Sequence, residues 1–412
     1  MKFDQYHISD SIKKNISKLA YKKPTDIQYK SIPPILKGED VLAIAQTGTG
    51  KTAAFAIPIL HILQERKVKG RKDGIKCLVM APTHELALQI EGVFNTLGKH
   101  TKVRSFCIHG GVDQEPQIQQ LNKGVDVLIA TPGRMFDLVS QGALNLNRVE
   151  ILVLDEADHM LDLGFIKDIN DLMRHLPKKR QTLFFSATIN DTIKKLAYSL
   201  VTRAIRIQIS PKDPVAKNIE HAVAFIEMDD KRFFLEALLK EHPEKKILVF
   251  VRTKVRAERV KAAMDRVSII ADTIHSDKLQ EEREDIMAAF RKGDLKVLIA
   301  TDVSARGIDI PDVEYVINYD LPETAENYVH RVGRTGRGRQ KGQAISFCSS
   351  EEKELLKEIE ENLNKEISKL AISKSDYRFT KDISDAKANN WQALMKEAAQ
   401  EEKGRKKRKF KR

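Results

Sequence analysis

The sequence predicts an α/β protein with two doubly wound parallel sheets in tandem. Short apolar runs recur along the chain, and each is followed by a stretch long enough for a helix. Because the strands of such a sheet are buried on both faces, they read as near-continuous apolar runs rather than as an alternation of apolar and polar residues. A break with two prolines and several charged residues separates two similar series of runs, which predicts two domains joined by a linker.

The expected strands set the expected domain bounds. The first series of strands lies at 41–44, 77–81, 125–130, 151–154 and 182–185, and the second at 247–251, 267–271, 296–300, 314–318 and 344–347. We therefore expect domains at 1–209 and 218–365, joined by a linker at 210–217. From 366 to 412 the hydrophobic density falls, and eight of the last ten residues are Lys or Arg, which predicts a basic, disordered tail.

Composition disfavours several classes of protein. No apolar stretch approaches the roughly 20 residues that cross a bilayer, and the first residues lack the apolar region of a secretory signal. Cys77, Cys107 and Cys348 are far apart and have no C-x-x-C spacing, so we interpret them as reduced thiols. The net charge of +13 favours a polyanionic partner, although the basic tail has a solubilising role as its alternative. We expect a cytoplasmic protein without membrane contact.

Residues 45–52, Ala-Gln-Thr-Gly-Thr-Gly-Lys-Thr, follow the first expected strand and precede a helix. Glycines let the turn wrap its backbone N–H groups around an anion, Lys51 can reach the outer phosphates, and Thr52 offers a hydroxyl to Mg²⁺. Ala45 stands where the general pattern has its first glycine. An ordinary glycine-rich turn is the alternative, but the order of strand, turn, lysine, hydroxyl and helix favours a phosphate cradle.

Asp155 and Glu156 close the apolar run at 151–154, so a parallel sheet would place both carboxylates at the same edge as the cradle. Asp155 can hold Mg²⁺ through its water shell, while Glu156 can orient and deprotonate the water that attacks the γ-phosphate. The alternative is that both acids only cap the next helix. The sequence at 155–158 is Asp-Glu-Ala-Asp.

This sequence resembles the signature of the DEAD-box family of RNA-dependent ATPases and helicases, and further similar motifs span about residues 1–360. Alanine is the usual first residue of that family's phosphate loop, which accounts for Ala45. Residues 1–29 resemble its Q motif, so the resemblance implies that Phe3 stacks on adenine, that Gln28 reads the edge of the base and that ATP is preferred over GTP. The resemblance implies two RecA-like domains and the following nucleotide-binding residues: Phe3, Tyr21, Thr25, Gln28, Ala45, Gln46, Thr47, Gly48, Thr49, Gly50, Lys51, Thr52 and Asp309.

The resemblance also implies a coupling motif and RNA contacts. The motif Ser186-Ala187-Thr188 resembles the segment that couples ATP hydrolysis to strand separation through Asp158. The implied RNA-binding residues are Pro82, Thr83, Gly110, Gly111, Thr131, Pro132, Gly133, Arg134, Arg252, Thr301 and Asp302. Such groups bind phosphates without reading bases. Taken singly, the motifs of the first half favour the alternative that they are turns or helix caps.

Residues 330–337 repeat arginine every third residue. Guanidinium groups from another domain can stabilise the charge on a transferring phosphoryl group. By resemblance, Arg334 and Arg337 are assigned to the γ-phosphate, and Arg331 to interdomain support and coupling; a basic loop that binds only RNA is the alternative. The expected catalytic residues are therefore Lys51, Asp155, Glu156, Arg334 and Arg337.

Three positions depart from the family pattern. Ala20 replaces a glycine, His84 replaces the arginine after Pro-Thr, and Ser276 replaces a glycine. The loss of a permanent charge at position 84 puts one phosphate or interdomain contact in doubt, whereas the other two changes concern local backbone freedom.

The sequence thus predicts an RNA-stimulated ATPase that opens short stretches of RNA duplex when ATP and RNA close the cleft between the domains. The expected cofactors are ATP and Mg²⁺, and the expected partner of a monomeric protein is structured or duplex RNA; ribonucleoprotein and RNA-decay partners are left open. An ATP-gated RNA clamp or ribosome-assembly scaffold with incidental unwinding is the alternative, and a DNA helicase is a second one. The loop at 45–52, the short length and the basic tail favour the bacterial RhlE-like branch.

Overall fold

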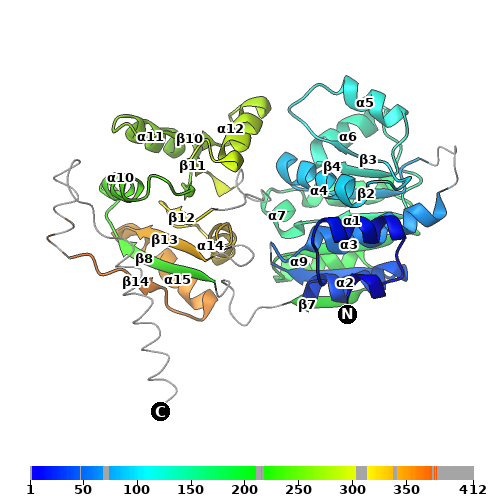
Figure 1. Cartoon of the computed structure of the whole chain (residues 1–412), viewed down its shortest axis with the longest axis horizontal. Helices are drawn as coiled ribbons and strands as arrows, with labels where there is room; N and C mark the ends of the chain where they lie inside the picture. Colours follow the sequence, from blue (N-terminus) through cyan, green and yellow to red (C-terminus); the bar gives the residue numbers. More distant parts are fainter. Residues whose placement is uncertain are drawn as a thin grey trace, which may run out of the picture. The chain divides into compact units, whose positions relative to one another are not determined.

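The structure, a computed structural model, describes residues 2–46, 48–67, 74–209, 215, 218–302, 313–336, 341–373, 375 and 377. The described residues up to Ile209 form one compact unit, unit 1, and those from Val215 onward form a second, unit 2 (Figure 1). The linker predicted at 210–217 falls almost entirely outside the described residues, as does most of the tail predicted at 366–412. The described part of that predicted tail includes the strand Ser368–Lys369, which pairs within unit 2, so unit 2 extends beyond the predicted bound at 365.

Unit 1 contains a parallel sheet of seven strands among its described residues, in the order β3-β4-β2-β5-β6-β1-β7. The strands are β1 (Val41–Ala45), β2 (Cys77–Met80), β3 (Ser105–Ile108), β4 (Val127–Ala130), β5 (Ile151–Leu154), β6 (Gln181–Ser186) and β7 (Ile205–Ile209). The helices are η1 (Phe3–Gln5), α1 (Asp10–Lys18), α2 (Asp26–Leu36), α3 (Lys51–Arg66), α4 (His84–Leu97), α5 (Glu115–Asn122), α6 (Pro132–Ser140), α7 (Ala157–Asp162), α8 (Ile166–His175) and α9 (Asp191–Leu200).

Two hydrophobic cores cover the two faces of this sheet. Along β1, Val41 and Ala43 belong to the core that contains buried residues of α1 to α4, whereas Leu42 and Ile44 belong to the core that contains those of α6 to α9. Alternate side chains of one strand thus enter opposite cores, which is why the strand reads as a continuous apolar run. The doubly wound arrangement predicted from the sequence is confirmed.

Unit 2 contains a second parallel sheet of seven strands among its described residues, in the order β10-β11-β9-β12-β13-β8-β14. The strands are β8 (Ile219–Phe225), β9 (Ile247–Phe250), β10 (Ala271–Ile274), β11 (Val297–Ala300), β12 (Tyr315–Asn318), β13 (Gly342–Cys348) and β14 (Ser368–Lys369). The helices are α10 (Lys231–Glu241), α11 (Lys254–Asp265), α12 (Gln280–Lys292), α14 (Ala325–Val332), η2 (Ser350–Glu352) and α15 (Lys353–Leu363).

One expected strand was misplaced, and four others were missed. The strand expected at 267–271 lies at Ala271–Ile274, because Ser268 has a left-handed φ of 61° and Ile270 is 81% exposed, so this apolar run is mostly a turn. The missed strands β3, β7, β8 and β14 carry partly exposed or polar residues, such as Arg206 in β7 and Glu220 in β8, which interrupt the apolar pattern. Within the described residues, no helix is both long and apolar enough to span a membrane.

Candidate functional site

The candidate site of unit 1 lies where its parallel strands end, and strand order divides its residues into two groups. The predicted nucleotide and coupling residues at 45–52, 155–158 and 186–188 follow β1, β5 and β6, which are neighbours in the sheet. The predicted RNA-binding residues follow β2, β3 and β4, which are also neighbours. The sheet therefore brings each group together from segments far apart in sequence.

The predicted phosphate cradle connects β1 to α3. Gly48 and Gly50 have left-handed φ values of 79° and 89°, a conformation that suits glycine in a tight turn. The hydroxyl of Thr49 donates to the Gln46 carbonyl at 2.7 Å, which closes the turn. The cradle has the expected form between strand and helix, although Thr47 lies outside the described residues.

The Q-motif glutamine contacts this cradle directly. The Gln28 side chain accepts a hydrogen bond from the Thr25 backbone N–H at 3.0 Å, and its amide nitrogen donates to the Gly50 carbonyl at 3.2 Å. A Cβ atom at position 50 would collide with the Gln28 amide, so glycine is needed there for close approach as well as for its φ. The structure thus ties the start of α2 to the turn that precedes α3.

The two aromatic residues predicted to bind the nucleotide lie near each other. Phe3 is buried in the core of unit 1, with its ring centroid 6.5 Å from that of Tyr21 and 6.3 Å from that of Tyr6. Tyr21 is 43% exposed and presents an aromatic surface beside the buried ring. The adenine-stacking role of Phe3 stays a prediction.

Lys51 is the most informative residue of the cradle. It is only 6% exposed, yet its Nζ has no hydrogen-bond partner among the described residues. A buried ammonium without a partner is costly, so the site fits an anionic ligand that supplies the missing acceptors. The oxygens of nucleotide phosphates have that chemistry.

Asp155 and Glu156 are both buried at the end of β5, as the sequence predicted. Burial raises the pKa of Asp155 to about 7; the positive charge of Lys51 opposes this rise and the charge of Glu156 adds to it. A carboxylate in such a place is stabilised by any nearby cation, so the oxygens of Asp155 and of the Thr52 hydroxyl fit Mg²⁺.

Glu156 has an unusual backbone. Its φ and ψ are both 50°, in the left-handed region, at the residue before α7. Its N–H donates to Oδ1 of Asp155 at 3.0 Å, and its Oε2 lies 3.6 Å from Nδ1 of His159. Such strain on a non-glycine residue is typical of functional sites, and here the same residue donates its backbone N–H to the Asp155 carboxylate.

The structure also joins the two segments predicted to couple hydrolysis to RNA. Oδ2 of Asp158 accepts hydrogen bonds from the Ala187 N–H at 3.1 Å, the Thr188 N–H at 3.0 Å and the Thr188 hydroxyl at 3.2 Å. Ser186 is buried at the end of β6. The acid motif and the Ser-Ala-Thr motif therefore form one hydrogen-bonded group, and its coupling role stays a prediction.

The predicted RNA-binding segments of unit 1 are turns and helix starts. Thr83 caps α4 by accepting from the Leu86 N–H at 3.3 Å, and Arg134, in the first turn of α6, donates to the Val112 carbonyl at 2.7 Å. His84, where the family has arginine, lies against His109, with ring centroids 5.2 Å apart. The remaining predicted contacts of unit 1 occupy the same strand ends: Pro82, Gly110, Gly111, Thr131, Pro132 and Gly133.

In unit 2, Arg331 is buried and bonded within its own unit. Its Nε and Nη2 donate to the two carboxylate oxygens of Asp302 at 2.5 and 2.7 Å, and its Nη1 donates to the Asp320 carbonyl at 2.7 Å. Thr301 is buried at the end of β11. Arg334 is also buried and donates from Nε to the His330 carbonyl at 3.1 Å. The predicted sites at Arg337 and Asp309 lie outside the described residues.

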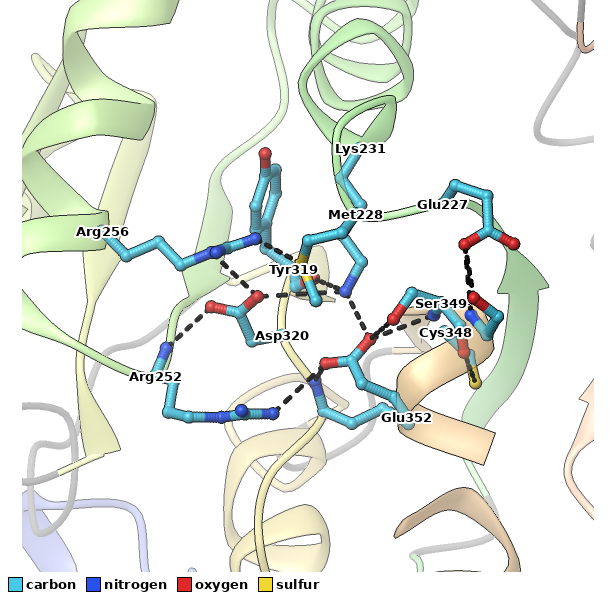
Figure 2. A network of polar contacts seen from close by, with 12 residues as sticks. Glu227, Met228, Lys231, Arg252, Arg256, Tyr319, Asp320, Cys348, Ser349 and Glu352 are labelled. Atoms are coloured by element: carbon cyan, nitrogen blue, oxygen red, sulfur yellow. Dashed lines mark hydrogen bonds and ion pairs between the residues drawn. The ribbon is translucent and has the colours of Figure 1, made fainter. Parts of the chain in front are cut away.

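Sequence reasoning assigned no role to three residues that surround the predicted RNA contact Arg252. Lys231, Asp320 and Glu352 form buried ion pairs beside it (Figure 2). No local pattern distinguishes Lys231 from the many other lysines of the chain, because its partners come from segments about 90 and 120 residues away. Only the folded sheet brings them together.

Two parallel sheets, a glycine-rich cradle whose buried lysine has no hydrogen-bond partner among the described residues, and an adjacent acid pair together indicate a nucleoside triphosphatase. Residues 25–196 match the DEAD/DEAH box helicase family, and residues 230–339 match the helicase conserved C-terminal domain. The chain is 37% identical to the ATP-dependent RNA helicase CshA of Listeria monocytogenes, over 96% of this chain and 75% of that protein. It is also 37% identical to the ATP-dependent RNA helicase DbpA of Bacillus subtilis, over 89% and 76%.

Solved structures agree with these relatives. The S. cerevisiae Dbp5 structure bound to RNA and ADP BeF3 matches with a TM-score of 0.81 and 31% identity, over 93% of this chain and 98% of that chain. A structure of the DEAD-box helicase Mss116 bound to ssRNA and UDP-BeF matches with a TM-score of 0.82 and 28% identity, over 92% and 82%. The chain belongs to the DEAD-box family of ATP-dependent RNA helicases, and it is an ATP-hydrolysing enzyme. The relatives named above are CshA and DbpA proteins, so the RhlE-like branch stays a prediction.

Proposed function

We propose that RNA stimulates ATP hydrolysis by this protein, and that hydrolysis is coupled to bending of the RNA and local opening of a duplex. The observation that carries the proposal is the buried Nζ of Lys51, which has no hydrogen-bond partner among the described residues and lies beside the acid pair Asp155 and Glu156. A site built this way favours bound phosphate over the empty state. The parallel sheet supports the rest, because it gathers the predicted RNA contacts at the ends of neighbouring strands.

In the proposed reaction, Lys51 and the N–H groups of the cradle hold the phosphates of ATP. Thr52 and Asp155, the latter through water, hold Mg²⁺, which supplies charge neutralisation for the phosphate oxygens. Glu156 accepts a proton from the attacking water as the new O–P bond forms. The bond between the γ-phosphorus and its bridging oxygen breaks, and its electron pair leaves with ADP.

The arginines of unit 2 complete the proposal. Arg334 and Arg337 stabilise the charge that develops on the γ-phosphoryl group when ATP and RNA together close the cleft between the domains. Asp309 contacts the ribose, and Arg331 supports the arginine series through Asp302. Phosphate release then reopens the cleft, and the RNA is freed.

The test is the ATPase rate of Glu156→Gln with and without a single-stranded RNA oligonucleotide. Loss of a general base lowers the rate by about 10²–10⁴-fold, so we expect at least a hundredfold decrease in the RNA-stimulated rate. Glu150→Gln is the matched control, because Glu150 is a part-exposed acid before the start of β5 and away from the cradle. An unchanged rate for Glu156→Gln would defeat the assigned mechanism.

Two assays separate the remaining alternatives. A strand-displacement assay with a short RNA duplex distinguishes unwinding from an ATP-gated clamp, since a clamp binds RNA yet releases no strand; no structural observation favours the clamp. A comparison of ATPase stimulation by matched RNA and DNA oligonucleotides tests whether the nucleic acid partner is RNA, because only RNA offers 2′-OH contacts. Equal stimulation by both would remove the RNA assignment.

The basic residues 403–412, which lie outside the described residues, are proposed to add sequence-independent RNA affinity. Truncation after Gln400 is expected to weaken RNA binding and to reduce its dependence on salt concentration. If affinity and salt dependence stay the same, the tail only improves solubility. A cytoplasmic location, a monomeric state and duplex or structured RNA as the partner complete the proposal.

A further inference from the structure

Five charged residues of unit 2 form one group where β12 ends, and we call it the β12-end cluster: Lys231, Arg252, Arg256, Asp320 and Glu352. They come from the start of α10, the loop after β9, the first turn of α11, the loop after β12 and η2. Figure 2 shows their side chains converging on the two carboxylates. Segments that span more than one hundred residues therefore meet at a single point.

The position of the cluster has a counterpart in unit 1. The strand orders β3-β4-β2-β5-β6-β1-β7 and β10-β11-β9-β12-β13-β8-β14 match strand for strand, so β8 corresponds to β1 and β12 to β5. Lys231 is the first residue of α10, as Lys51 is the first residue of α3, and residues 226–230 and 46–50 make the two connections equal in length. Lys231 thus occupies in unit 2 the place that the phosphate-binding lysine occupies in unit 1.

In unit 2 the lysine at this position is bound by other residues of the same unit. Lys231 is fully buried, and its Nζ donates to Oε2 of Glu352 at 2.6 Å and to the Tyr319 carbonyl at 2.7 Å. Oδ1 of Asp320 lies 3.9 Å from the same nitrogen. The Glu352 carboxylate therefore supplies the negative charge that a bound phosphate supplies in unit 1. Burial lowers the pKa of Lys231, and the charge of Glu352 partly offsets that effect.

The two carboxylates also hold Arg252. Oδ2 of Asp320 accepts from the Arg252 backbone N–H at 3.0 Å, and Oε1 of Glu352 accepts from its Nη2 at 3.4 Å. The same Oε1 accepts from the Leu321 N–H at 3.0 Å, which fixes the carboxylate itself. The Arg252 side chain remains 40% exposed, so its guanidinium keeps a surface for a ligand.

Arg256 pairs with Asp320, whereas the Arg252 guanidinium pairs with Glu352. Nε of Arg256 lies 2.9 Å from Oδ1 of Asp320, and its guanidinium carbon lies 5.5 Å from the centroid of the Tyr319 ring. The carboxylates of Asp320 and Glu352 face three cations in total, and Arg252 is the most exposed of them. The cluster therefore keeps a net positive charge on its solvent side, where a phosphate can bind.

We infer that Lys231 and Glu352 are positioning residues, which hold Arg252 at the end of β9 in the orientation that binds an RNA phosphate. The inference rests on the proposed RNA contact of Arg252. Glu352 fixes the guanidinium and Lys231 fixes Glu352. The carbonyl of Asp320 also accepts a hydrogen bond from Arg331 at 2.7 Å, so the same loop connects the RNA contact to the arginine series.

The test uses the full chain carrying two substitutions, Lys231→Met and Glu352→Gln. This double variant removes one charge of each sign and keeps a hydrogen-bond acceptor at position 352. The RNA concentration that half-saturates ATPase activity is measured together with kcat at saturating RNA. We expect the half-saturating concentration to rise about tenfold, as for loss of one charge-assisted hydrogen bond, with a change in kcat several times smaller. Arg252→Ala is expected to raise it to a similar extent.

A double-mutant cycle separates positioning from a merely structural role. If Lys231 and Glu352 act through Arg252, the double variant has no further effect on half-saturation in the Arg252→Ala background. The matched control is Lys245→Met with Glu314→Gln, the same two substitutions at a half-exposed pair of unit 2 whose atoms lie 2.6 Å apart. We expect its half-saturating concentration to stay within twofold of the wild type.

Glu352→Asp, which keeps the charge beside Lys231 but shortens the reach to Arg252, replaces the double variant if circular dichroism shows that the latter is unfolded. Additive effects of the double variant and Arg252→Ala, an unchanged half-saturating concentration, or failure of both variants to fold would overturn the inference. Wild-type protein without RNA stimulation would instead defeat the proposed function, and Arg252→Ala without effect would defeat the RNA contact of Arg252 on which the inference rests.

Discussion

Two buried lysines begin corresponding helices of the two units, and they differ in one respect. Lys51 starts α3 with no hydrogen-bond partner for its Nζ among the described residues, whereas Lys231 starts α10 with a carboxylate and a carbonyl bonded to it. The strands around them have the same order and direction. One fold thus holds the same residue type in the same place with different hydrogen-bond partners.

The difference shows how a parallel α/β unit gains or loses a ligand site. A buried cation needs an acceptor, and the acceptor comes either from a ligand or from the chain. In unit 2 the turn after β13 provides Glu352, so the place is closed to phosphate. In unit 1 the corresponding strand β6 ends in Ser186 and leads to Thr188, whose N–H and hydroxyl donate to Asp158, so this segment gives Nζ of Lys51 no acceptor among the described residues.

The largest expected effect is on the stability of unit 2 in Lys231→Met. This change leaves Glu352 buried without its cation, and breaking a buried pair in this way costs about 3–5 kcal/mol. Urea unfolding, monitored by hydrogen exchange of the backbone amides in β8 and β12, measures the loss in the free energy of unfolding. The additional substitution Glu352→Gln should restore most of the lost stability. An equal loss of stability in the single and double variants would show that the charge of Glu352 is not the cause.

Lys51→Met should affect activity far more than stability. Nζ of Lys51 has no hydrogen-bond partner among the described residues, although its charge favours the ionised form of Asp155, so we expect a loss of stability well below that of Lys231→Met. The ATPase rate should fall about 10²–10³-fold, as it does when a donor to a developing negative charge is lost. A thermal melt without nucleotide and a steady-state ATPase assay measure the two effects. A large loss of stability without nucleotide would mean that Lys51 has a structural partner after all.

The pH dependence of unit 2 provides a smaller effect. Burial alone would raise the pKa of Glu352, but the charge of Lys231 and the hydrogen bonds from Lys231, Ser349 and Leu321 hold it below its ordinary value. The folded state therefore releases this proton more readily than the unfolded state. The resulting stability is fully present above the ordinary pKa of glutamate and is lost as the pH falls through the lower pKa of the folded state.

Urea midpoints of the wild type and of the Lys231→Met, Glu352→Gln double variant, compared from pH 6 downward, measure this contribution. The difference between the two proteins should shrink as the pH falls through the acidic range, because the pair is then neutralised in the wild type. A difference that stays constant with pH would show that Glu352 contributes no charge to the stability of the folded protein.

The smallest effect is expected at a paired lysine on the surface. Lys245 lies 2.6 Å from Glu314, and both side chains are about 40% exposed. Water screens such a pair, so replacing it with Met and Gln should change the free energy of unfolding by less than about 1 kcal/mol. The same urea titrations provide the measurement. A loss as large as that of Lys231→Met would show that burial is not what separates the two pairs.

The sequence by itself determined the features that depend on neighbouring residues. The glycines before Lys51, the acid pair after the apolar run at 151–154 and the arginine repeat at 330–337 could each be read within a few residues, because the turn, strand or helix that presents them is local. The same apolar runs predicted the doubly wound architecture. Strand predictions from these apolar runs were wrong where a turn was apolar, as at Ile270, and missed a strand that was partly exposed, as in β7.

Only the tertiary structure decided which of these residues meet and which lysines are satisfied. Gln28 contacts Gly50, Asp158 contacts Thr188, and Lys231 contacts Glu352 across separations of 22, 30 and 121 residues. Strand order sets these contacts, and the short range of hydrogen bonds and ion pairs means that no local pattern reveals them. Whether a buried lysine binds a phosphate or supports the core depends on the acceptor that the fold places beside it.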